Sequence, residues 1–574
     1  MRHEQRDQFS SGASARRPRT ASTLQNVALG GVVLLASVAL LALAGCGSDN
    51  NAPPPQASAP QPGPPPLTAD GFPATIAGLD PVLVQQGQKV FRYDTFGDET
   101  FWTGTLQMNQ VIQQAVTPLV AASVGIKIDV DKLPPSVVQG VVTGTIPLNS
   151  TQTTLALIQL GAVVGIKGDV ETDPATGQLT LKSVGVTCAL CHSTVSKDVH
   201  VDAPGGVDLT GIVGHRLDGW PNRDLNPGAI IALSPAVNGG STPTAAQKAM
   251  TAVYNSWGAG FYDPRFNVNI DPGSNAALAG TDVLGNITAY LKASDTPLGS
   301  PAGTRLGNPT LIPPAYGLVG ITKSIYTGDG DTAHEPAGPV AYWNRYVGVT
   351  QMHGHGTFSD PRLLISNASN QPLSVNFIDS SFVCPPITAD FPGPTGPDCV
   401  TAVLPALQAY QWSIAAPAMA DDGGEFGFVS DLDPTQVAAG KTVFDNSCAS
   451  CHNPNTAFTD VNSFGLHQPS ASVALKQTYL AFSATKMWRT SPLAGIWEHP
   501  PYLHDGSGAY NASTGKCMDG STITPSSASS AMPSTLQAAA TNDLACTVNL
   551  YDSKMNLALT DTQKTALVQY LKSL

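Results

Sequence analysis

The stretches "VGVTCALCHSTV" (Val184–Val195) and "DNSCASCHNP" (Asp445–Pro454) carry the same short pattern. In each, two cysteines stand two residues apart, and a histidine follows the second cysteine directly. The whole chain of 574 residues holds 9 Cys and 11 His. Chance would place only about 0.003 such motifs in a chain of this composition. Two copies therefore need a chemical cause.

The spacing of both motifs predicts covalent attachment of c-type haem. The two thiols reach the two vinyl groups of the porphyrin, and the adjacent imidazole becomes the proximal ligand of the iron. The alternatives are a thioredoxin-like redox pair or half of a zinc site, but zinc would need a second cysteine pair nearby, which neither motif has. The expected attachment residues are Cys188, Cys191, Cys448 and Cys451, and the expected proximal ligands are His192 and His452.

The N-terminal segment is typical of a secretory signal, because arginines precede a short apolar run that ends in small residues. The sequence "LAGC" (Leu43–Cys46) resembles a bacterial lipobox. We therefore expect residues 1–46 to be a lipoprotein signal peptide that leaves Cys46 lipidated; an ordinary signal peptide cut nearby is the alternative. Residues 47–72 are rich in proline and predict an extended tether.

These features predict a location in the cell envelope, with the protein held to a membrane by its lipid anchor. No aspartate follows Cys46, which favours the outer membrane, facing the periplasm or the cell surface. The net charge of −13 and the absence of a basic run exclude nucleic acid as a partner class. An acidic surface suits a basic or dipolar redox partner.

Four cysteines are left once the lipid and the two haems are assigned, and disulfides persist in exported proteins. Three pairings are open, and sequence proximity favours Cys384–Cys399 and Cys517–Cys546.

The composition predicts a mainly α fold with extensive irregular loops. The chain is 42% apolar and 12% charged, with 55 Gly and 47 Pro, which favours short helices between turns. We expect two cytochrome c-type haem domains with insertions: a first domain over residues 73–380, a connecting segment over 381–433 and a second domain over 434–574.

Two helical patterns set these boundaries. The segment Pro434–His452 predicts a helix followed by a loop that leads into the haem motif. The segment Asp80–Trp102 has the same Gly-x-x-Val-Phe pattern, but no cysteines follow it there. The first domain would then carry a long insertion between its opening helix and Cys188. A Thr-x-x-Gln capping box at Thr560 and Gln563 predicts the closing helix of the second domain.

Three further stretches resemble the di-haem cytochrome c peroxidase superfamily, which includes the di-haem enzyme that matures the methylamine dehydrogenase cofactor and the rubber oxygenases. The clearest is "KMWRTSPLAGIWEHPPYLHDGS" (Lys486–Ser507), in which the proline after the arginine is shifted by one position. The others are "GHRLDGWPNRDLN" (Gly214–Asn226) and "GFYDPR" (Gly260–Arg265), where Tyr262 replaces the tryptophan of the family. The resemblance covers both haem domains and points to a member with long insertions.

The resemblance implies distal ligands for both irons, and the sixth ligand sets potential and access. For the first haem it implies His215, with His200 or an open iron site as alternatives. His353 and His355, in a Gly-rich loop, could line a haem pocket or simply form loop hydrogen bonds. For the second haem it implies Tyr551, whose rivals are Met518 and Met555; a core tyrosine is the alternative.

The resemblance also implies roles around the haems. Tyr262 or Trp220 would bridge the two haems, Arg489 would bind a propionate, and His504 would belong to the shell between the haems. Calcium, which the family holds between its haems, is only weakly indicated here. Asn222 could match a ligand, but the "GDGD" run (Gly328–Asp331) is too short for a calcium loop.

We therefore expect a peroxidase-like oxidoreductase that passes electrons between two haems, receives them from a small redox protein or a quinol-linked donor, and reacts with peroxide or dioxygen. The alternatives are a pure electron carrier and a haem dioxygenase resembling the rubber oxygenases. The acid needed for proton transfer is not evident from the sequence; Asp218, Asp224 and Asp263 are candidates.

Overall fold

A computed structural model describes most of the chain beyond residue 66. The described residues are 67–68, 70–263, 309–352, 399–418, 432–455, 458–459, 466–467, 480, 483, 485–523 and 534–574. Residues 62–574 form one unit and residues 1–61 another. The signal peptide with Cys46, most of the tether, His353, His355 and Cys384 lie outside the described residues, as does the side chain of Cys399.

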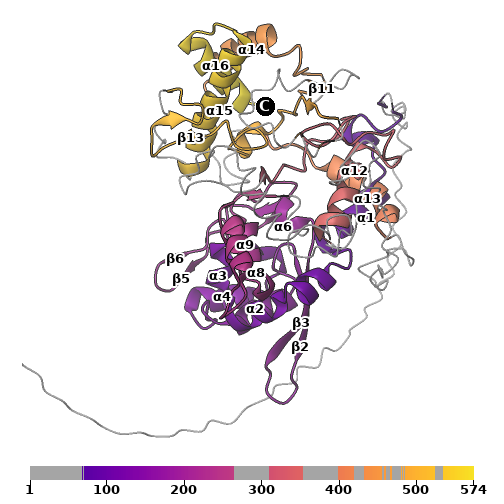
Figure 1. Cartoon of the computed structure of the whole chain (residues 1–574), viewed down its shortest axis with the longest axis vertical. Helices are drawn as coiled ribbons and strands as arrows, with labels where there is room; N and C mark the ends of the chain where they lie inside the picture. The colour runs from indigo at the N-terminus through magenta and orange to yellow at the C-terminus, as the bar shows by residue number, and fades with distance from the viewer. Residues whose placement is uncertain are drawn as a thin grey trace, which may run out of the picture. The chain divides into compact units, whose positions relative to one another are not determined.

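The first half is organised around two crossing helices, α1 (Pro81–Tyr93) and α13 (Cys399–Ser413) (Figure 1). Asp80 caps α1 by accepting a hydrogen bond from the backbone of Val82 at 2.9 Å. Gly87 allows the close approach, because a Cβ there would lie 1.9 Å from the carbonyl oxygen of Ala406. Next to this crossing Phe91 packs edge-on against Tyr410, with ring centroids 5.4 Å apart.

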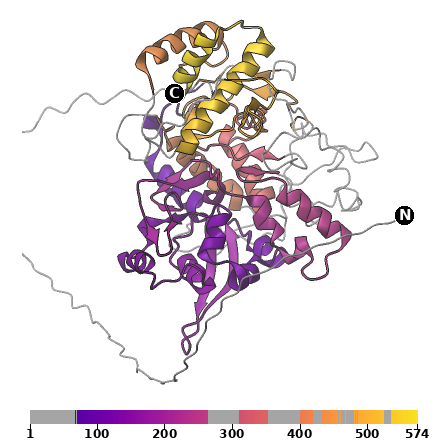
Figure 2. The same cartoon turned by 90° about the vertical axis from the view of Figure 1, so that its left-hand side faces the viewer.

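The second half repeats this crossing with α14 (Pro434–Ser447) and α16 (Asp561–Lys572), which lie together in both views (Figure 1 and Figure 2). A Cβ on Gly440 would lie 2.0 Å from the carbonyl oxygen of Ala566. Phe444 packs against Tyr570 at 5.1 Å. The predicted capping box at the start of α16 is present in full.

Helix α13 lies in the segment that the sequence assigns to a connection between domains. Its packing against α1 extends the first half to at least Ser413. The opening helices of the two halves, α1 and α14, also match in sequence. Each is preceded by an aspartate and begins with a proline, and each carries its crossing glycine at the same distance from that aspartate (Asp80 and Gly87, Asp433 and Gly440).

The long insertion between α1 and the first motif forms a small helical layer and a hairpin. Helix α5 packs on the hairpin of β2 and β3, and α2 packs on β3 (Figure 1). Residues from these elements share one apolar core. The elements are α2 (Met108–Ala115), α3 (Pro118–Ser123), β1 (Ile128–Asp129), α4 (Pro135–Thr143), α5 (Thr151–Gln159), β2 (Ile166–Thr172) and β3 (Leu179–Val186).

The first half continues past its motif through short strands and helices. Strand β4 pairs with β8, β9 with β10, β5 with β6, and β7 runs parallel to β1. In chain order the elements are α6 (Ala189–His192), β4 (Ser193–Val195), β5 (Asp202–Ala203), β6 (Val207–Asp208), β7 (Val213–Gly214), β8 (Arg216–Asp218), α7 (Pro227–Ala232), α8 (Pro235–Asn238), α9 (Ala245–Asn255), β9 (Phe261–Tyr262), β10 (Thr310–Leu311) and α12 (Pro339–Tyr346).

The second half adds a long helix and two short strand pairs to α14 and α16. Strand β11 pairs with β12 and β13 with β14. The elements are β11 (Leu466–His467), β12 (Trp488–Arg489), β13 (Tyr510–Asn511), β14 (Lys516–Cys517) and α15 (Ser534–Met555).

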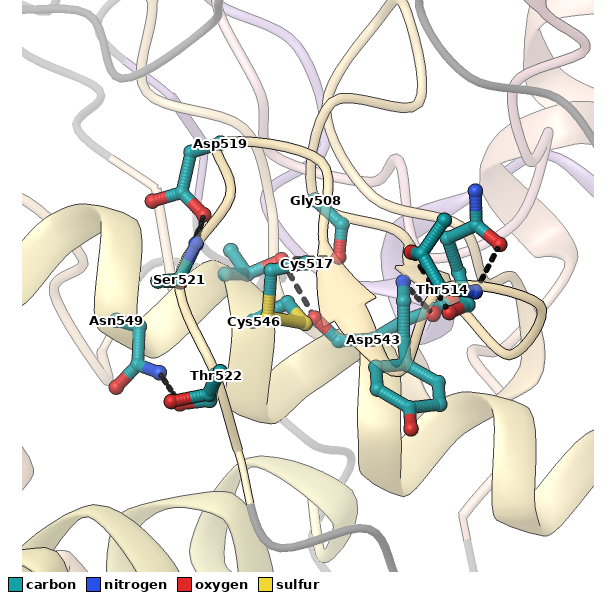
Figure 3. Close-up of a disulfide and its surroundings, with 12 residues drawn as sticks. Gly508, Thr514, Cys517, Asp519, Ser521, Thr522, Asp543, Cys546 and Asn549 are labelled. Atoms are coloured by element: carbon teal, nitrogen blue, oxygen red, sulfur yellow. Dashed lines mark hydrogen bonds between the residues drawn. A yellow bond between two sulfur atoms is a disulfide. The ribbon is translucent and has the colours of Figure 1, made fainter.

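A disulfide joins Cys517 of β14 to Cys546 of α15, as sequence proximity predicts. Figure 3 shows this bond with the hydrogen bonds around it, among them Asn549 donating to the carbonyl oxygen of Thr522 at 3.4 Å. The bond therefore ties the loop that carries β13 and β14 to the long helix.

The expectation of a mainly α fold is wrong. Among the interpretable residues 43% are helical and 13% are in strands, so the fold is mixed, with many short strands and loops. The main cause is the insertion, in which β2 and β3 carry branched apolar residues at alternating positions and pair over their full length. The remaining strands are mostly two-residue pairs that join glycine- and proline-rich loops.

Candidate functional site

The first motif sits where three segments meet. Cys188 follows β3 after one residue, α6 carries the motif to His192, and β4 begins directly after it. The carbonyl oxygens of Cys191 and His192 accept hydrogen bonds from the backbone of Asn222 and Gly219, at 2.9 and 2.8 Å. The segment 214–226 is thus fixed along the motif.

The imidazole of His192 is oriented for metal binding. Its Nδ1 lies 2.9 Å from the carbonyl oxygen of Pro313, so Nδ1 carries the proton and Nε2 is the atom left to bind iron. Burial, together with the nearby Arg223 charge, lowers the pKa of His192 to about 4. The ring is therefore neutral at physiological pH, as a metal ligand must be.

The second motif repeats this arrangement with different partners. Nδ1 of His452 lies 2.9 Å from the carbonyl oxygen of Phe458. Burial lowers the pKa of this imidazole as well. Nε2 is again the nitrogen left for a ligand bond, which is the tautomer and orientation that a proximal haem histidine has.

The four motif cysteines are not joined in disulfides. Burial raises the pKa of Cys191 to about 12 and that of Cys448 to about 11, and it also raises the pKa of Cys188. Among the described residues, no group of three or more His, Cys, Asp or Glu side chains could hold a metal ion, whereas a structural zinc site is closed by four such ligands.

A cavity of about 80 Å³ opens beside His192. Apart from His192 its described lining residues carry no imidazole, thioether or amine group. Pro313 and Pro314 form part of the wall, and Tyr326, Trp343 and Arg489 contribute the large side chains.

Two buried arginines at this site have donors without partners. Nε of Arg489 has none among the described residues, while its Nη1 donates to the carbonyl oxygen of Lys323 at 2.6 Å. Nε and Nη1 of Arg223 also lack partners, while its Nη2 donates to the carbonyl oxygen of His499 at 3.0 Å. Burial lowers the pKa of Arg489 to about 10 and also lowers that of Arg223.

Unpaired buried guanidinium donors are costly, and an anion would relieve that cost. The two propionates of a haem beside His192 are anions of the right kind. Arg489, which the resemblance implies as a propionate partner, has its side chain at the cavity beside His192.

Glu498 is the buried acid of this region. It is 4% exposed, and its Oε2 accepts a hydrogen bond from the hydroxyl of Tyr316 at 3.1 Å. Burial raises the pKa of Glu498 to about 8, although the Arg223 charge lowers it. The sequence suggested three other acids. The carboxyl of Asp218 accepts hydrogen bonds from Arg92, Ser193 and Tyr410. Asp224 forms an ion pair with Lys127, and Asp263 is fully buried.

The structure argues against His215 as the distal ligand of the first haem and as a catalytic residue. Its side chain is 52% exposed, and Nδ1 lies 2.9 Å from a carboxyl oxygen of Asp131. His215 does not line the cavity beside His192. His215 lies between β7 and β8, and its carbonyl oxygen accepts a hydrogen bond from the backbone of Ser196 at 2.9 Å. His200 is also exposed, and its Nδ1 lies 3.2 Å from Oγ1 of Thr210.

Tyr551 lies in α15 near the second motif. Burial raises its pKa to about 12, and the thiols of Cys448 and Cys451 add to this rise. Its rival Met555 is 40% exposed at the end of the helix. Tyr551 as a distal ligand stays a prediction.

Trp220 and Tyr262 are both buried, in different clusters. Trp220 packs edge-on against Trp497 at 6.0 Å and against Tyr316 at 6.5 Å, joining the two halves of the chain. Tyr262 lies in β9, inside the core of the first half. Neither lines the cavity beside His192.

A different set of rings reaches from this cavity to the second motif. His504 is 5% exposed, and its ring lies 5.9 Å from that of Tyr326 and 4.4 Å from that of Trp488. Trp488 lies in β12, three residues before Ser491. The backbone of Ser491 forms a hydrogen bond with His452 that raises the pKa of this imidazole, so Trp488 lies close along the chain to the second motif. His504 thus lies where a residue of the shell between two haems would lie.

Sequence reasoning missed Tyr326, Trp488, Arg223 and Glu498. Trp488 and Glu498 stand inside the stretch that carries the resemblance, but nothing in their spacing marks them. Arg223 and Tyr326 become visible only through burial, which the sequence around them does not predict.

Nothing in the described residues supports calcium. Asn222 donates to the carbonyl oxygen of Gly125 at 2.8 Å and leaves only Oδ1 without a partner. In the Gly328–Asp331 run, Asp329 accepts hydrogen bonds from Ser483 and Thr485, and Asp331 pairs with His334.

No protein-family model, no curated protein and no solved structure matches this chain.

Proposed function

We propose that this chain is a di-haem c-type redox protein of peroxidase type. Cys188 with Cys191, and Cys448 with Cys451, would hold the haems by thioether bonds. His192 and His452 would bind the irons through Nε2. The observation that carries the proposal is the matched orientation of the two histidines, each with a lowered pKa and each held through Nδ1 by a backbone carbonyl at 2.9 Å.

A bound haem would supply reversible one-electron chemistry, and the chain would supply its environment. Arg223 and Arg489 would bind and orient the propionates of the first haem through the donors that lack partners. The rings of Tyr326, His504 and Trp488 would form the contact path between the two sites.

Peroxide or dioxygen reactivity is supported at the first site. Besides His192, the described residues that line its cavity offer only the phenol of Tyr326 as a possible iron ligand. That hydroxyl donates to the carbonyl oxygen of Leu311 at 3.3 Å, so a small oxidant would have room to enter. The hydrogen-bonded pair of Glu498 and Tyr316 holds a proton near Arg223 at neutral pH, which reduction of an oxygen–oxygen bond requires.

We infer a location in the cell envelope with Cys46 as the lipid anchor, and a small redox protein or a quinol-linked enzyme as the electron donor. The support is the sequence of the N-terminal segment and the acidic net charge of −13. Within the described residues, no helix is long and apolar enough to cross a membrane.

The first test is a haem count on full-length protein made with a c-type maturation system. Cys188→Ala with Cys191→Ala should halve the pyridine haemochrome yield per chain, and so should Cys448→Ala with Cys451→Ala, because each pair would hold one haem. Cys517→Ala with Cys546→Ala is the matched control and should keep both haems. Haem that is lost entirely on acid-acetone extraction would contradict the proposal.

Electron paramagnetic resonance of the same protein separates the functional alternatives. One high-spin haem that disappears in Cys188→Ala with Cys191→Ala, together with peroxide turnover, is the expected result. Two low-spin haems without peroxide turnover would mean a pure electron carrier. Oxygen consumption on an alkene, without an electron donor, would favour a dioxygenase of the kind that the rubber oxygenases represent.

A further inference from the structure

Two further cavities lie in and around the insertion before the first motif. The first, of about 70 Å³, is lined by α3, α4, α5 and the strands next to them. The second, of about 80 Å³, lies between α2, α5, β3 and α7 and reaches Leu190, between the two cysteines of the first motif. The cavities share one wall, made of Ala121, Ile126, Thr154 and Val163.

Both cavities are apolar almost throughout. None of the described residues that line them carries a charge. Their polar groups are the hydroxyls of Thr153 and Thr154 and the indole of Trp102. Thr153 donates to the carbonyl oxygen of Pro147 at 2.8 Å, and Trp102 interacts with the carboxyl of Asp98. Engineered apolar cavities stay dry and bind apolar molecules.

Thr154 is the exception that points to a ligand. It is 6% exposed, lines both cavities, and its hydroxyl has no hydrogen-bond partner among the described residues. A buried hydroxyl without a partner carries a desolvation cost that a ligand oxygen would remove. One such hydroxyl at the shared wall can serve one ligand oxygen.

The outer edge of the cavities is apolar as well. Leu119 and Val120 of α3 are 38% and 39% exposed, and Leu233, just after α7, is 41% exposed. Leu119 lines the first cavity, and the other two line the second. A hydrocarbon could therefore pass from the surface into either cavity without meeting a charged side chain.

We propose that the insertion binds a neutral long-chain hydrocarbon with a single oxygen function, such as a fatty alcohol. The chain would fill the two cavities, and its oxygen would hydrogen-bond the hydroxyl of Thr154. A fatty-acid carboxylate fits poorly, because no lining cation would compensate for its buried charge. This site goes beyond the haem proposal and does not depend on it.

The test compares three ligands of equal chain length on the full-length holoprotein at pH 8: 1-dodecanol, dodecane and dodecanoate. Each is titrated against N-phenyl-1-naphthylamine, a fluorescent apolar reporter. We expect 1-dodecanol to displace the reporter at the lowest concentration and dodecanoate at the highest. Thr154→Val should raise the Kd for 1-dodecanol by about 2- to 10-fold, as expected for one neutral hydrogen bond, and leave that for dodecane unchanged.

Two controls locate the site. Thr187→Val removes another buried hydroxyl without a partner, one that lines neither cavity, and should change no affinity. Ala121→Leu narrows both cavities and should abolish reporter binding, whereas Ala122→Leu narrows only the first and should weaken it. Dodecanoate binding as tightly as 1-dodecanol would overturn the proposal, as would an unchanged alcohol affinity in Thr154→Val or reporter binding that survives Ala121→Leu. All of these measurements report ligand binding and require no redox turnover. A failure of the haem proposal would therefore not produce the outcomes that contradict the hydrocarbon site.

Discussion

At the scale of single residues, the most unusual group is the carboxyl of Glu498. Its pKa is raised to about 8, chiefly by burial, and its Oε2 lies 3.1 Å from the hydroxyl of Tyr316. Arg223 then has no carboxylate partner at neutral pH, although it is half-buried. This is why its two unpartnered donors suit an external anion.

Glu498 should make the folded state less stable as pH rises. Its pKa is about 4.5 in an ordinary carboxyl and about 8 in the folded chain, so between these values unfolding releases a proton. The free energy of unfolding should therefore fall through this window by up to about 1.4 kcal/mol per pH unit from this group. Glu498→Gln, which stays neutral, should lack that loss.

Urea unfolding of wild type and Glu498→Gln at pH 5, 6.5 and 8 checks this expectation. The variant should gain stability relative to wild type at each step upward. If the free energy of unfolding changed with pH by the same amount in both proteins, the folded chain would hold no extra proton on Glu498.

At this scale the sequence points to candidate ligands but not to their surroundings. The motif itself marks His192 and His452 as the expected imidazoles. The carbonyl that orients His192 belongs to Pro313, far along the chain, and no local pattern connects the two. For His215, the resemblance gives a position in the sequence but not the direction of the side chain, which is 52% exposed.

At the scale of elements, the repeated helix crossing depends on two glycines. A methyl group on Gly87 or Gly440 would meet a backbone carbonyl oxygen at 1.9 or 2.0 Å, and backbone cannot move aside as a side chain can. Alanine gains about 1 kcal/mol in helix propensity, but overpacking costs about 1–3 kcal/mol and should prevail. Gly87→Ala and Gly440→Ala should therefore each lower stability.

Gly104→Ala is the matched control, because a Cβ there would have no heavy atom within 4 Å. Thermal and urea unfolding should show the first two variants destabilised and the control unchanged. A stable Gly440→Ala beside a destabilised Gly87→Ala would mean that the two crossings are not equivalent.

The sequence predicted α1, α14 and α16 and missed α13 and the hairpin of β2 and β3. The three helices carry capping signals and apolar periodicity. Helix α13 contains Pro405, which by sequence rules interrupts a helix, and yet the helix continues through it because α1 packs against one face. The hairpin of β2 and β3 was missed because the high Gly and Pro content of the whole chain favours the prediction of loops over strands.

At the scale of the whole molecule, the ring path through His504 links one candidate site to the other. Trp488→Leu should slow electron exchange between the two sites, because it removes the ring 4.4 Å from His504. Trp412→Leu is the control: Trp412 is equally buried, packs on Phe72 at 5.5 Å and lies outside the path. Each variant should lose less stability than the about 3–5 kcal/mol typical of a buried Trp→Ala change.

Flash photolysis of the half-reduced protein measures the exchange directly. Slower exchange in Trp488→Leu alone would support the path. Equal slowing in both variants would indicate a general loss of packing, and unchanged rates in both would exclude these rings as the route.

The repeated crossing also bears on how the chain folds. The partners of the second crossing, α14 and α16, are much closer in sequence than α1 and α13, between which the insertion and most of the first half intervene. Loop-closure entropy grows only with the logarithm of length, so this difference costs less than about 1 kcal/mol of stability. Folding speed is more sensitive, because distant contacts form late. When the complete chain refolds, the C-terminal crossing should thus close first. During synthesis the order is reversed, since α13 precedes α14 and α16 along the chain. The first motif then waits for α13, which is made some two hundred residues later, on the order of ten to forty seconds at ordinary rates of translation.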